Sequence, residues 1–187
     1  MFYIISNPII CMDCWGIITF LGLPEAWSAI SLAMVLAYIM LIHTSWAKPS
    51  PERRAFKAAA VLMALTLILA FFSVRAIKET TQIPRSCIPC PAEDCNPYCI
   101  ENDFSFPSGH AATIFAVCTA AYLLLRRRSG LLLYIPAALI AYSRVALGVH
   151  TPADAAAGSA IGILSCLVIW KLQPRMGILS TLKDKKR

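Results

Sequence analysis

Charged side chains are scarce in this sequence. Only 14% of its 187 residues are Asp, Glu, Lys or Arg, whereas a soluble domain carries about 25%. Apolar residues make up 58%, and five long runs contain no charge at all: residues 26–42, 58–74, 111–125, 131–143 and 155–170. A soluble helical protein of this length would lack the polar surface needed to cover five buried helices. The composition therefore argues against a soluble globular protein.

The predicted fold is all-α, a polytopic membrane helix bundle that forms a single domain over residues 1–187. With flanking residues, each of the five runs approaches the ~20 residues that cross a ~30 Å hydrocarbon core. A shorter helix is expected from Pro8 to Gly22. At ~22 Å it is too short to span comfortably, so we expect an interfacial helix or a sixth crossing. No basic residue precedes this stretch, which argues against a cleaved signal peptide.

Basic residues are nearly absent from one side of the expected bundle. If the five runs alternate in direction, thirteen of the seventeen Lys and Arg residues fall on the side of the C-terminus. The positive-inside rule makes that side the cytoplasm, and the cell (plasma or inner) membrane the expected location. The extracytoplasmic face keeps only Arg75, Lys78, Arg85 and Arg144. The net charge of +7 is then a topology signal and gives no indication of nucleic-acid binding.

Histidine is also rare, and two of the three histidines belong to polar motifs at that outer face. The motifs are Lys78 and Arg85 (K-x6-R), Pro107-Ser108-Gly109-His110, and Ser143-Arg144 followed by His150 and Asp154. Charges beside a bilayer are costly and by default functional. Three cations that converge suit a polyanion, and the point charge of a Lys with the planar fork of an Arg suits the oxygens of a phosphate.

The second motif has the features of an anion site at the start of a helix. Proline and serine fit a helix N-terminus, and Gly109 lets the backbone approach a ligand closely. The free N–H groups of the first turn and the positive end of the helix dipole attract anions. His110 would lie in this turn, where it can donate a proton.

The third motif combines an imidazole with a carboxylate. Thr151-Pro152-Ala153-Asp154 has the pattern of an N-cap, a first-turn proline and an acidic third position, which places Asp154 within reach of His150. A carboxylate that holds one imidazole nitrogen makes the other a better nucleophile or base. A plain helix cap and a metal site are the alternatives. Three converging cations would repel a divalent ion and no third ligand is offered, so no metal is expected.

Half of the eight cysteines lie in the outer segment, residues 76–106. Two disulfides are expected on an oxidising outer face, and a structural zinc site or free thiols are the alternatives. The cysteines concerned are Cys87, Cys90, Cys95 and Cys99. Cys118 and Cys166 lie inside apolar runs and are expected to be small packing residues.

Together the three motifs resemble those of the type 2 phosphatidic acid phosphatase superfamily, which includes membrane lipid phosphatases, glucose-6-phosphatase and vanadium haloperoxidases. The resemblance spans Lys78 to Asp154. It implies a metal-independent phosphatase that needs no cofactor. The implied phosphate-binding residues are Lys78, Arg85, Ser108, Gly109 and Arg144. The implied catalytic residues are His150, which forms a phosphohistidine, Asp154, which orients it, and His110, which protonates the leaving oxygen.

Two features depart from the family pattern. Ser86 follows Arg85 where the family usually has proline, and the first helix is short. The first change removes no charge, and the second concerns the route by which a lipid enters.

The resemblance therefore implies an integral membrane lipid phosphatase with an extracytoplasmic site. A polyprenyl (undecaprenyl-type) diphosphate is the expected substrate, with phosphatidylglycerol phosphate, phosphatidate and a lipid A phosphate as alternatives. A haloperoxidase disagrees with the apolar runs, and a non-enzymatic phospholipid-binding or transport protein is the alternative of another class. The expected partners are the lipid phosphate and membrane lipids, without nucleic acid, and the oligomeric state stays open.

Overall fold

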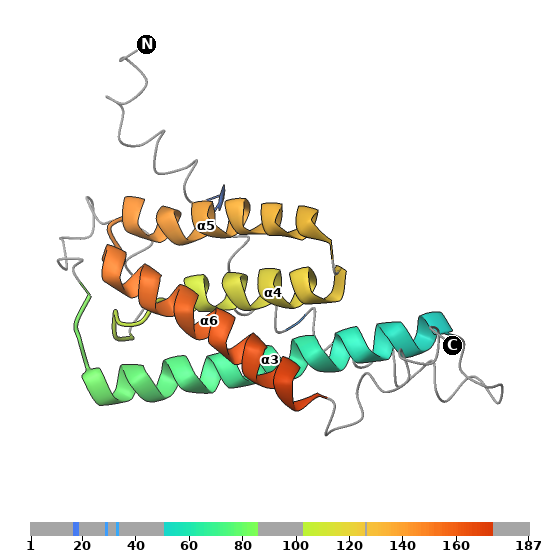
Figure 1. The fold of residues 1–187 in the computed structure, drawn as a ribbon. Coiled ribbons are helices and arrows are strands. Elements are labelled where there is room, and N and C mark those ends of the chain that lie inside the picture. The colour runs from blue at the N-terminus through green and yellow to red at the C-terminus, as the bar shows by residue number, and fades with distance from the viewer. Residues whose placement is uncertain are drawn as a thin grey trace, which may run out of the picture.

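The computed structural model of the protein describes residues 17–18, 29, 33, 51–85, 103–125 and 127–173. Its helices are α3 (Pro51–Thr81), α4 (Gly109–Leu125), the 3-10 helix η2 (Arg128–Leu133), α5 (Tyr134–Ala146) and α6 (Pro152–Leu172), as Figure 1 shows. No strand occurs in these ranges, so the all-α class is confirmed for the described part of the chain. The predicted N-terminal helix, the run of residues 26–42 and the cysteines of residues 87–99 lie outside the described residues, apart from single helical positions.

Three helical stretches are long and apolar enough to cross a membrane: Ala59–Thr81, Arg128–Ala146 and Pro152–Leu172. At 1.5 Å per α-helical residue the first and third measure ~35 and ~32 Å, and the second, which begins with the 3-10 helix η2 at ~2.0 Å per residue, also measures ~32 Å. All are close to the ~30 Å of a hydrocarbon core. Helix α4 is also apolar but has only 17 residues. The runs predicted at residues 58–74, 111–125, 131–143 and 155–170 all lie within these helices. The total of five spanning helices with a short sixth stays a prediction.

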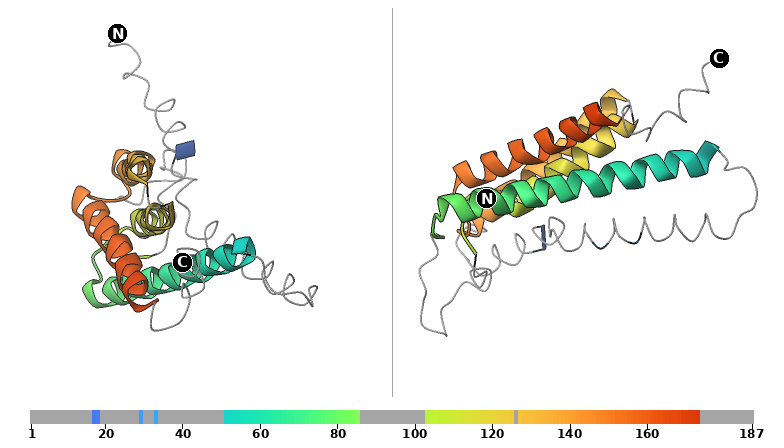
Figure 2. Two further views of the ribbon diagram at one scale, coloured as in Figure 1. Left: turned by 45° about the vertical axis from the view of Figure 1, so that its right-hand side comes forward. Right: turned by 90° about the horizontal axis from the view of Figure 1, so that it is seen from below.

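Successive helices run antiparallel. The C-terminal ends of α3 and α5 and the N-terminal ends of α4 and α6 therefore lie together at one end of the bundle (Figure 1, Figure 2). Helix α4 contacts α3, α5, α6 and η2, and ten of its residues are buried. A helix that is apolar around its whole circumference suits this central position. The start of α4 is thus surrounded by the ends of the other helices.

Two glycines bring α6 against the backbone of α4. A Cβ atom added to Gly158 would lie 2.3 Å from the Ser108 carbonyl oxygen, and one added to Gly162 would lie 2.2 Å from the Ala112 carbonyl oxygen. Small residues four apart allow this approach in membrane helices, where close packing and not the hydrophobic effect holds helices together. The α4–α6 contact is the most extensive one among the described helices.

The outward surfaces of the bundle are apolar. Phe71 and Phe72 on α3 and Leu164 and Leu167 on α6 are exposed, although each is a large hydrophobic side chain. Several exposed large hydrophobic side chains on two helices indicate contact with lipid or another apolar partner. It agrees with helices that cross a membrane.

Candidate active site

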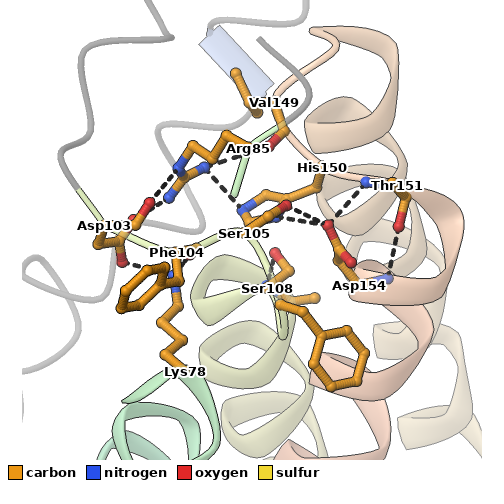
Figure 3. Close-up of polar contacts among 12 residues, drawn as sticks. Lys78, Arg85, Asp103, Phe104, Ser105, Ser108, Val149, His150, Thr151 and Asp154 are labelled. Carbon is orange, nitrogen blue, oxygen red and sulfur yellow. Dashed lines mark hydrogen bonds and ion pairs between the residues drawn. The ribbon is translucent and has the colours of Figure 1, made fainter. Parts of the chain in front are cut away.

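Helix α6 begins with a capping box that places a carboxylate beside an imidazole (Figure 3). The Thr151 hydroxyl accepts a hydrogen bond from the Asp154 N–H at 3.2 Å, and the Thr151 N–H donates to Asp154 Oδ2 at 2.9 Å. The cap predicted from Thr-Pro-Ala-Asp is confirmed. The same Oδ2 atom lies 3.3 Å from His150 Nδ1. One carboxylate therefore closes the helix and orients the histidine.

Ser105 joins this pair from the segment that precedes α4. Its hydroxyl donates to Asp154 Oδ2 at 2.5 Å and lies 3.5 Å from His150 Nδ1. Its own N–H donates to the Ile83 carbonyl oxygen at 2.8 Å, which ties it to the chain after α3. Ser105, His150 and Asp154 are all buried. The imidazole is thus fixed on its Nδ1 side by groups from two separate segments.

The other ring nitrogen of His150 faces Arg85. Arg85 Nη1 lies 3.3 Å from His150 Nε2 (Figure 3). A guanidinium can only donate, so Nε2 must accept and the ring proton must lie on Nδ1, where Asp154 Oδ2 accepts it. In this tautomer Nε2 carries the lone pair. The nitrogen with nucleophilic character therefore points toward the cations.

The turn between α5 and α6 carries His150 back over the end of α5. The N–H groups of Val149 and His150 both donate to the Arg144 carbonyl oxygen at 3.2 Å. Gly148 has a φ of +71°, a left-handed conformation that favours glycine. The Gly148 N–H donates to Val145 O at 2.9 Å, which closes the turn.

The surroundings of His150 keep its ring neutral. Burial, together with the positive charges of Arg85 and Arg144, lowers the pKa of His150 from 6.5 to about 4, against the opposing effect of the hydrogen bond to Asp154. A neutral imidazole has the free lone pair that a nucleophile requires. His150 is therefore neutral at neutral pH.

This lowered pKa predicts the acid limb of any activity that uses His150 as a nucleophile. The neutral form persists as the pH falls and is lost only near pH 4, so kcat/KM should decline there and not near 6.5. The measurement is kcat/KM against pH, with the affinity of a non-hydrolysable phosphonate followed over the same range to remove the ionisation of the substrate. A protein-dependent limb near pH 6.5 would contradict the prediction.

The two cations of the first motif converge on one carboxylate. Lys78 Nζ lies 2.5 Å from Asp103 Oδ2, and Arg85 Nη2 pairs with Asp103 Oδ1. Lys78 also donates to the Phe104 carbonyl oxygen, and Arg85 Nη1 donates to the Val149 carbonyl oxygen at 3.3 Å (Figure 3). Burial alone would raise the pKa of the Asp103 carboxyl, but the hydrogen bonds and charges of Lys78 and Arg85 hold it below its usual value. Asp103 is therefore ionised at neutral pH.

The remaining predicted residues lie at the same end of the bundle. Ser108 precedes α4, and its hydroxyl accepts from the Ala111 N–H at 3.5 Å. The Ser108 N–H donates to the Asp154 carbonyl oxygen at 3.0 Å, so this amide is already engaged, while Gly109 opens α4. His110 is buried, and its Nε2 has no hydrogen-bond partner among the described residues.

Arg144, in the last turn of α5, is fully buried. Its charge acts on both His110 and His150. The structure thus gathers the residues of all three motifs at the end where α4 and α6 begin. Their roles stay predictions.

Asp103 and Ser105 were missed by the sequence analysis. Both lie after the end of α3, in the segment where the sequence pattern points only to the cysteines. One signal was present in the sequence: Asp103 is an acidic residue in the segment that joins Lys78 and Arg85 to the second motif, where a carboxylate could pair with those cations. Among the described residues, no group of three or more His, Cys, Asp or Glu side chains is arranged to hold a metal ion. Cys118 and Cys166 are buried free thiols, as expected.

The chain belongs to the PAP2 superfamily, whose sequence profile matches residues 58–177. With its membrane-crossing helices it is an integral membrane protein. The matched residues contain all three motifs described above.

Individual relatives match shorter stretches. YbjG of Escherichia coli (strain K12), whose name provisionally assigns it as an undecaprenyl-diphosphatase, is 44% identical over 37% of this chain and 36% of its own. The undecaprenyl-diphosphatase of Sulfolobus acidocaldarius is 32% identical over 52% of this chain and 49% of its own. The bacitracin transport permease protein BcrC of Bacillus licheniformis is 34% identical over 42% of this chain and 38% of its own. The chain thus spans half or less of the length of these relatives.

Two solved structures share the fold over most of the chain. LpxE of Aquifex aeolicus superposes with a TM-score of 0.57 at 24% identity, covering 87% of this chain and 86% of its own. A transmembrane PAP2-type phosphatidylglycerolphosphate phosphatase of Bacillus subtilis gives a TM-score of 0.63 at 21% identity, covering 88% and 77%. At these identities the likeness establishes the fold alone.

Proposed function

We propose that the protein is a lipid phosphatase that removes a terminal phosphate from a lipid diphosphate through a phosphohistidine intermediate. The observation that carries the proposal is the state of His150. The ring is neutral, Asp154 and Ser105 hold its Nδ1 side, and its Nε2 faces Arg85. A binding protein has no need for an imidazole held in this tautomer beside cations, whereas a nucleophile at phosphorus requires one.

In the proposed reaction, His150 Nε2 attacks phosphorus while the bond from phosphorus to the lipid-side oxygen breaks. His110, which must take up a proton when the phosphate dianion binds, gives this proton to that oxygen and becomes neutral. Asp154 stabilises the positive charge that develops on the ring of His150. Water then attacks the phosphohistidine, His110 takes a proton from this water, and the bond from phosphorus to Nε2 breaks. Inorganic phosphate leaves, and both histidines return to their starting states.

The cations stabilise the negative charge of the transferring phosphoryl group. Lys78, Arg85 and Arg144 are proposed to bind its oxygens, helped by the Ser108 hydroxyl and the Gly109 N–H at the start of α4. Preorganised charges in a site shielded from water supply most of what phosphoryl transfer requires. The scheme uses no metal ion.

A polyprenyl diphosphate is the proposed substrate. Two relatives carry names of undecaprenyl-diphosphatases, which supports this substrate class. The site lies at one end of a bundle with apolar outer surfaces, so a phosphate on a lipid tail can reach it by lateral diffusion. Phosphatidylglycerol phosphate, phosphatidate and a lipid A phosphate are the alternatives.

The proposed arrangement in the membrane follows from the charges. Residues 1–187 form one domain with five spanning helices and a short N-terminal helix. The site faces the extracytoplasmic side, and the basic C-terminus lies in the cytoplasm. Arg127 and Arg128, at the opposite end of α4 from the site, support this orientation.

The test is phosphate release in detergent micelles from a polyprenyl diphosphate and from phosphatidate, with EDTA present. We expect turnover that EDTA does not inhibit, a faster rate with the diphosphate, and an acid-labile phosphoryl group on the protein after rapid quenching. The absence of release from either lipid by well-folded protein would contradict a lipid phosphatase of this specificity. Retained lipid binding without release would favour the transport or binding class.

A further inference from the structure

Asp103 pairs with two of the cations that are proposed to bind phosphate, Lys78 and Arg85. The Lys78 and Arg85 side chains are only 4% and 7% exposed, whereas the Asp103 side chain is 36% exposed. The carboxylate therefore covers two buried cations from the solvent side. Figure 3 shows Asp103 beside Arg85 and Lys78, on the side of Arg85 that faces away from His150.

The geometry of this contact resembles the binding of a phosphate. The two carboxylate oxygens are divided between the cations, with Oδ2 on Lys78 and Oδ1 on Arg85. A phosphoryl group presents its oxygens to a lysine and an arginine in the same divided way. The Arg85 guanidinium also donates to the Asp103 carbonyl oxygen at 3.2 Å. These donors are engaged by the protein itself.

Arg85 has a second contact that must change when substrate binds. Its Nη1 lies 3.3 Å from His150 Nε2, the nitrogen proposed to attack phosphorus. While this N–H donates to Nε2, the lone pair of the nucleophile is occupied. Transfer of Arg85 from Asp103 and His150 to a phosphoryl oxygen would release the nucleophile as the substrate arrives.

We propose that Asp103 is a specificity-determining residue, a built-in anion that the phosphoryl group must displace from Lys78 and Arg85. The proposal rests on the function proposed above. A terminal phosphate with two negative charges and three free oxygens can displace a single carboxylate, whereas a singly charged phosphodiester competes less well. Asp103 thus favours terminal phosphates over the diester headgroups of the surrounding lipid, and it weakens the binding of the inorganic phosphate that the reaction leaves behind.

A purely positioning role for Asp103 predicts the opposite change in phosphate affinity. If Asp103 served only to hold Lys78 and Arg85 in place beside a bound phosphate, its removal would loosen them and weaken phosphate binding. If Asp103 competes with phosphate, its neutralisation should strengthen that binding. The sign of the change therefore decides between the two roles.

The experiment compares Asp103→Asn with wild type, using inorganic phosphate and dimethyl phosphate as probes and isothermal titration in micelles as the readout. We expect Asp103→Asn to bind inorganic phosphate about tenfold more tightly, since hydrogen bonds to charged groups contribute on that scale. Dimethyl phosphate should gain more than inorganic phosphate, because Asp103 is proposed to discriminate against diesters, and an equal gain would contradict its role in specificity. The matched control is Glu79→Gln, which makes the same change of charge one residue from Lys78 but in an exposed pair with Arg75. It should leave both affinities unchanged.

Weaker or unchanged phosphate binding by folded Asp103→Asn would overturn the proposal. If that variant does not fold, infrared difference spectra of wild type and Asp103→Glu on addition of phosphate provide the second test. Displacement predicts a carboxylate band that changes with phosphate and shifts in the glutamate variant, and its absence would overturn the proposal. Because these readouts are binding and spectra, they are independent of turnover. Wild-type protein that binds phosphate but hydrolyses no lipid would contradict the proposed function instead.

Discussion

Replacement of His150 by glutamine is expected to abolish phosphate release from any lipid substrate. Glutamine keeps much of the volume of the buried ring but has no lone pair that can attack phosphorus. Loss of a nucleophile in an enzyme of covalent mechanism lowers kcat by at least ~10⁴-fold. The measurement is phosphate release over long incubations, with quenched samples analysed for the phosphohistidine, which should also be absent.

A binding measurement makes this result specific to chemistry. Lys78 and Arg85 do not depend on a nucleophile to attract an anion, so affinity for inorganic phosphate should stay within a few-fold of wild type in His150→Gln. The matched control is His43→Gln, the same change at the histidine outside the motifs, which should retain full turnover. Turnover of His150→Gln within tenfold of wild type would refute the phosphohistidine mechanism. Unchanged lipid binding with no turnover in wild type as well would point to the non-enzymatic class.

Replacement of Gly162 by alanine is expected to damage both stability and activity, although Gly162 is far along α6 from the histidines. The added Cβ would lie 2.2 Å from the Ala112 carbonyl oxygen and 2.9 Å from the Ala116 nitrogen, and backbone atoms cannot rotate away. The helices must separate, at a cost of about 1–3 kcal/mol. Asp154 begins the same helix and accepts the Ser108 N–H through its carbonyl oxygen, so separation also disturbs the site.

The measurements are the thermal unfolding of the protein in detergent and kcat/KM for the preferred lipid. Both should fall in Gly162→Ala. The matched control is Ala160→Val, which adds a larger group on an exposed part of the same helix and should leave both nearly unchanged. Equal behaviour of the two variants would mean that α4 and α6 tolerate separation and that the glycine contact has no role in holding the site.

Local rules explain what could be predicted from the sequence. The charge-free runs located four of the described helices because a bilayer leaves few alternatives to an apolar helix. The runs ended too early where Arg75 and Lys78 occur, because α3 continues to Thr81 with Arg75 paired to Glu79. The capping pattern located Asp154 beside His150, because two residues only four positions apart in the chain must lie close together.

Contacts between distant segments were beyond such rules. Asp103 meets Lys78 across 25 residues, and Ser105 meets Asp154 across 49. These contacts depend on how the segment before α4 folds back onto the end of α3, which no periodicity records. The family resemblance rests on the three motifs, and neither Asp103 nor Ser105 belongs to them. The residues that could not be predicted are therefore those that hydrogen-bond or pair with the motif residues from distant segments.

The close contact of α4 with α6 restricts substitution in one part of the site more than in the other. His110 and Asp154 are carried on two helices joined backbone to backbone, where almost any larger side chain is excluded. Lys78 lies at the end of α3, whose exposed Phe71 and Phe72 meet no such restriction. Substitutions can thus change the lipid-facing surface of α3 without changing the positions of His110 and Asp154. The choice of lipid can therefore change through the surface of α3, while the residues proposed to carry out the reaction stay the same.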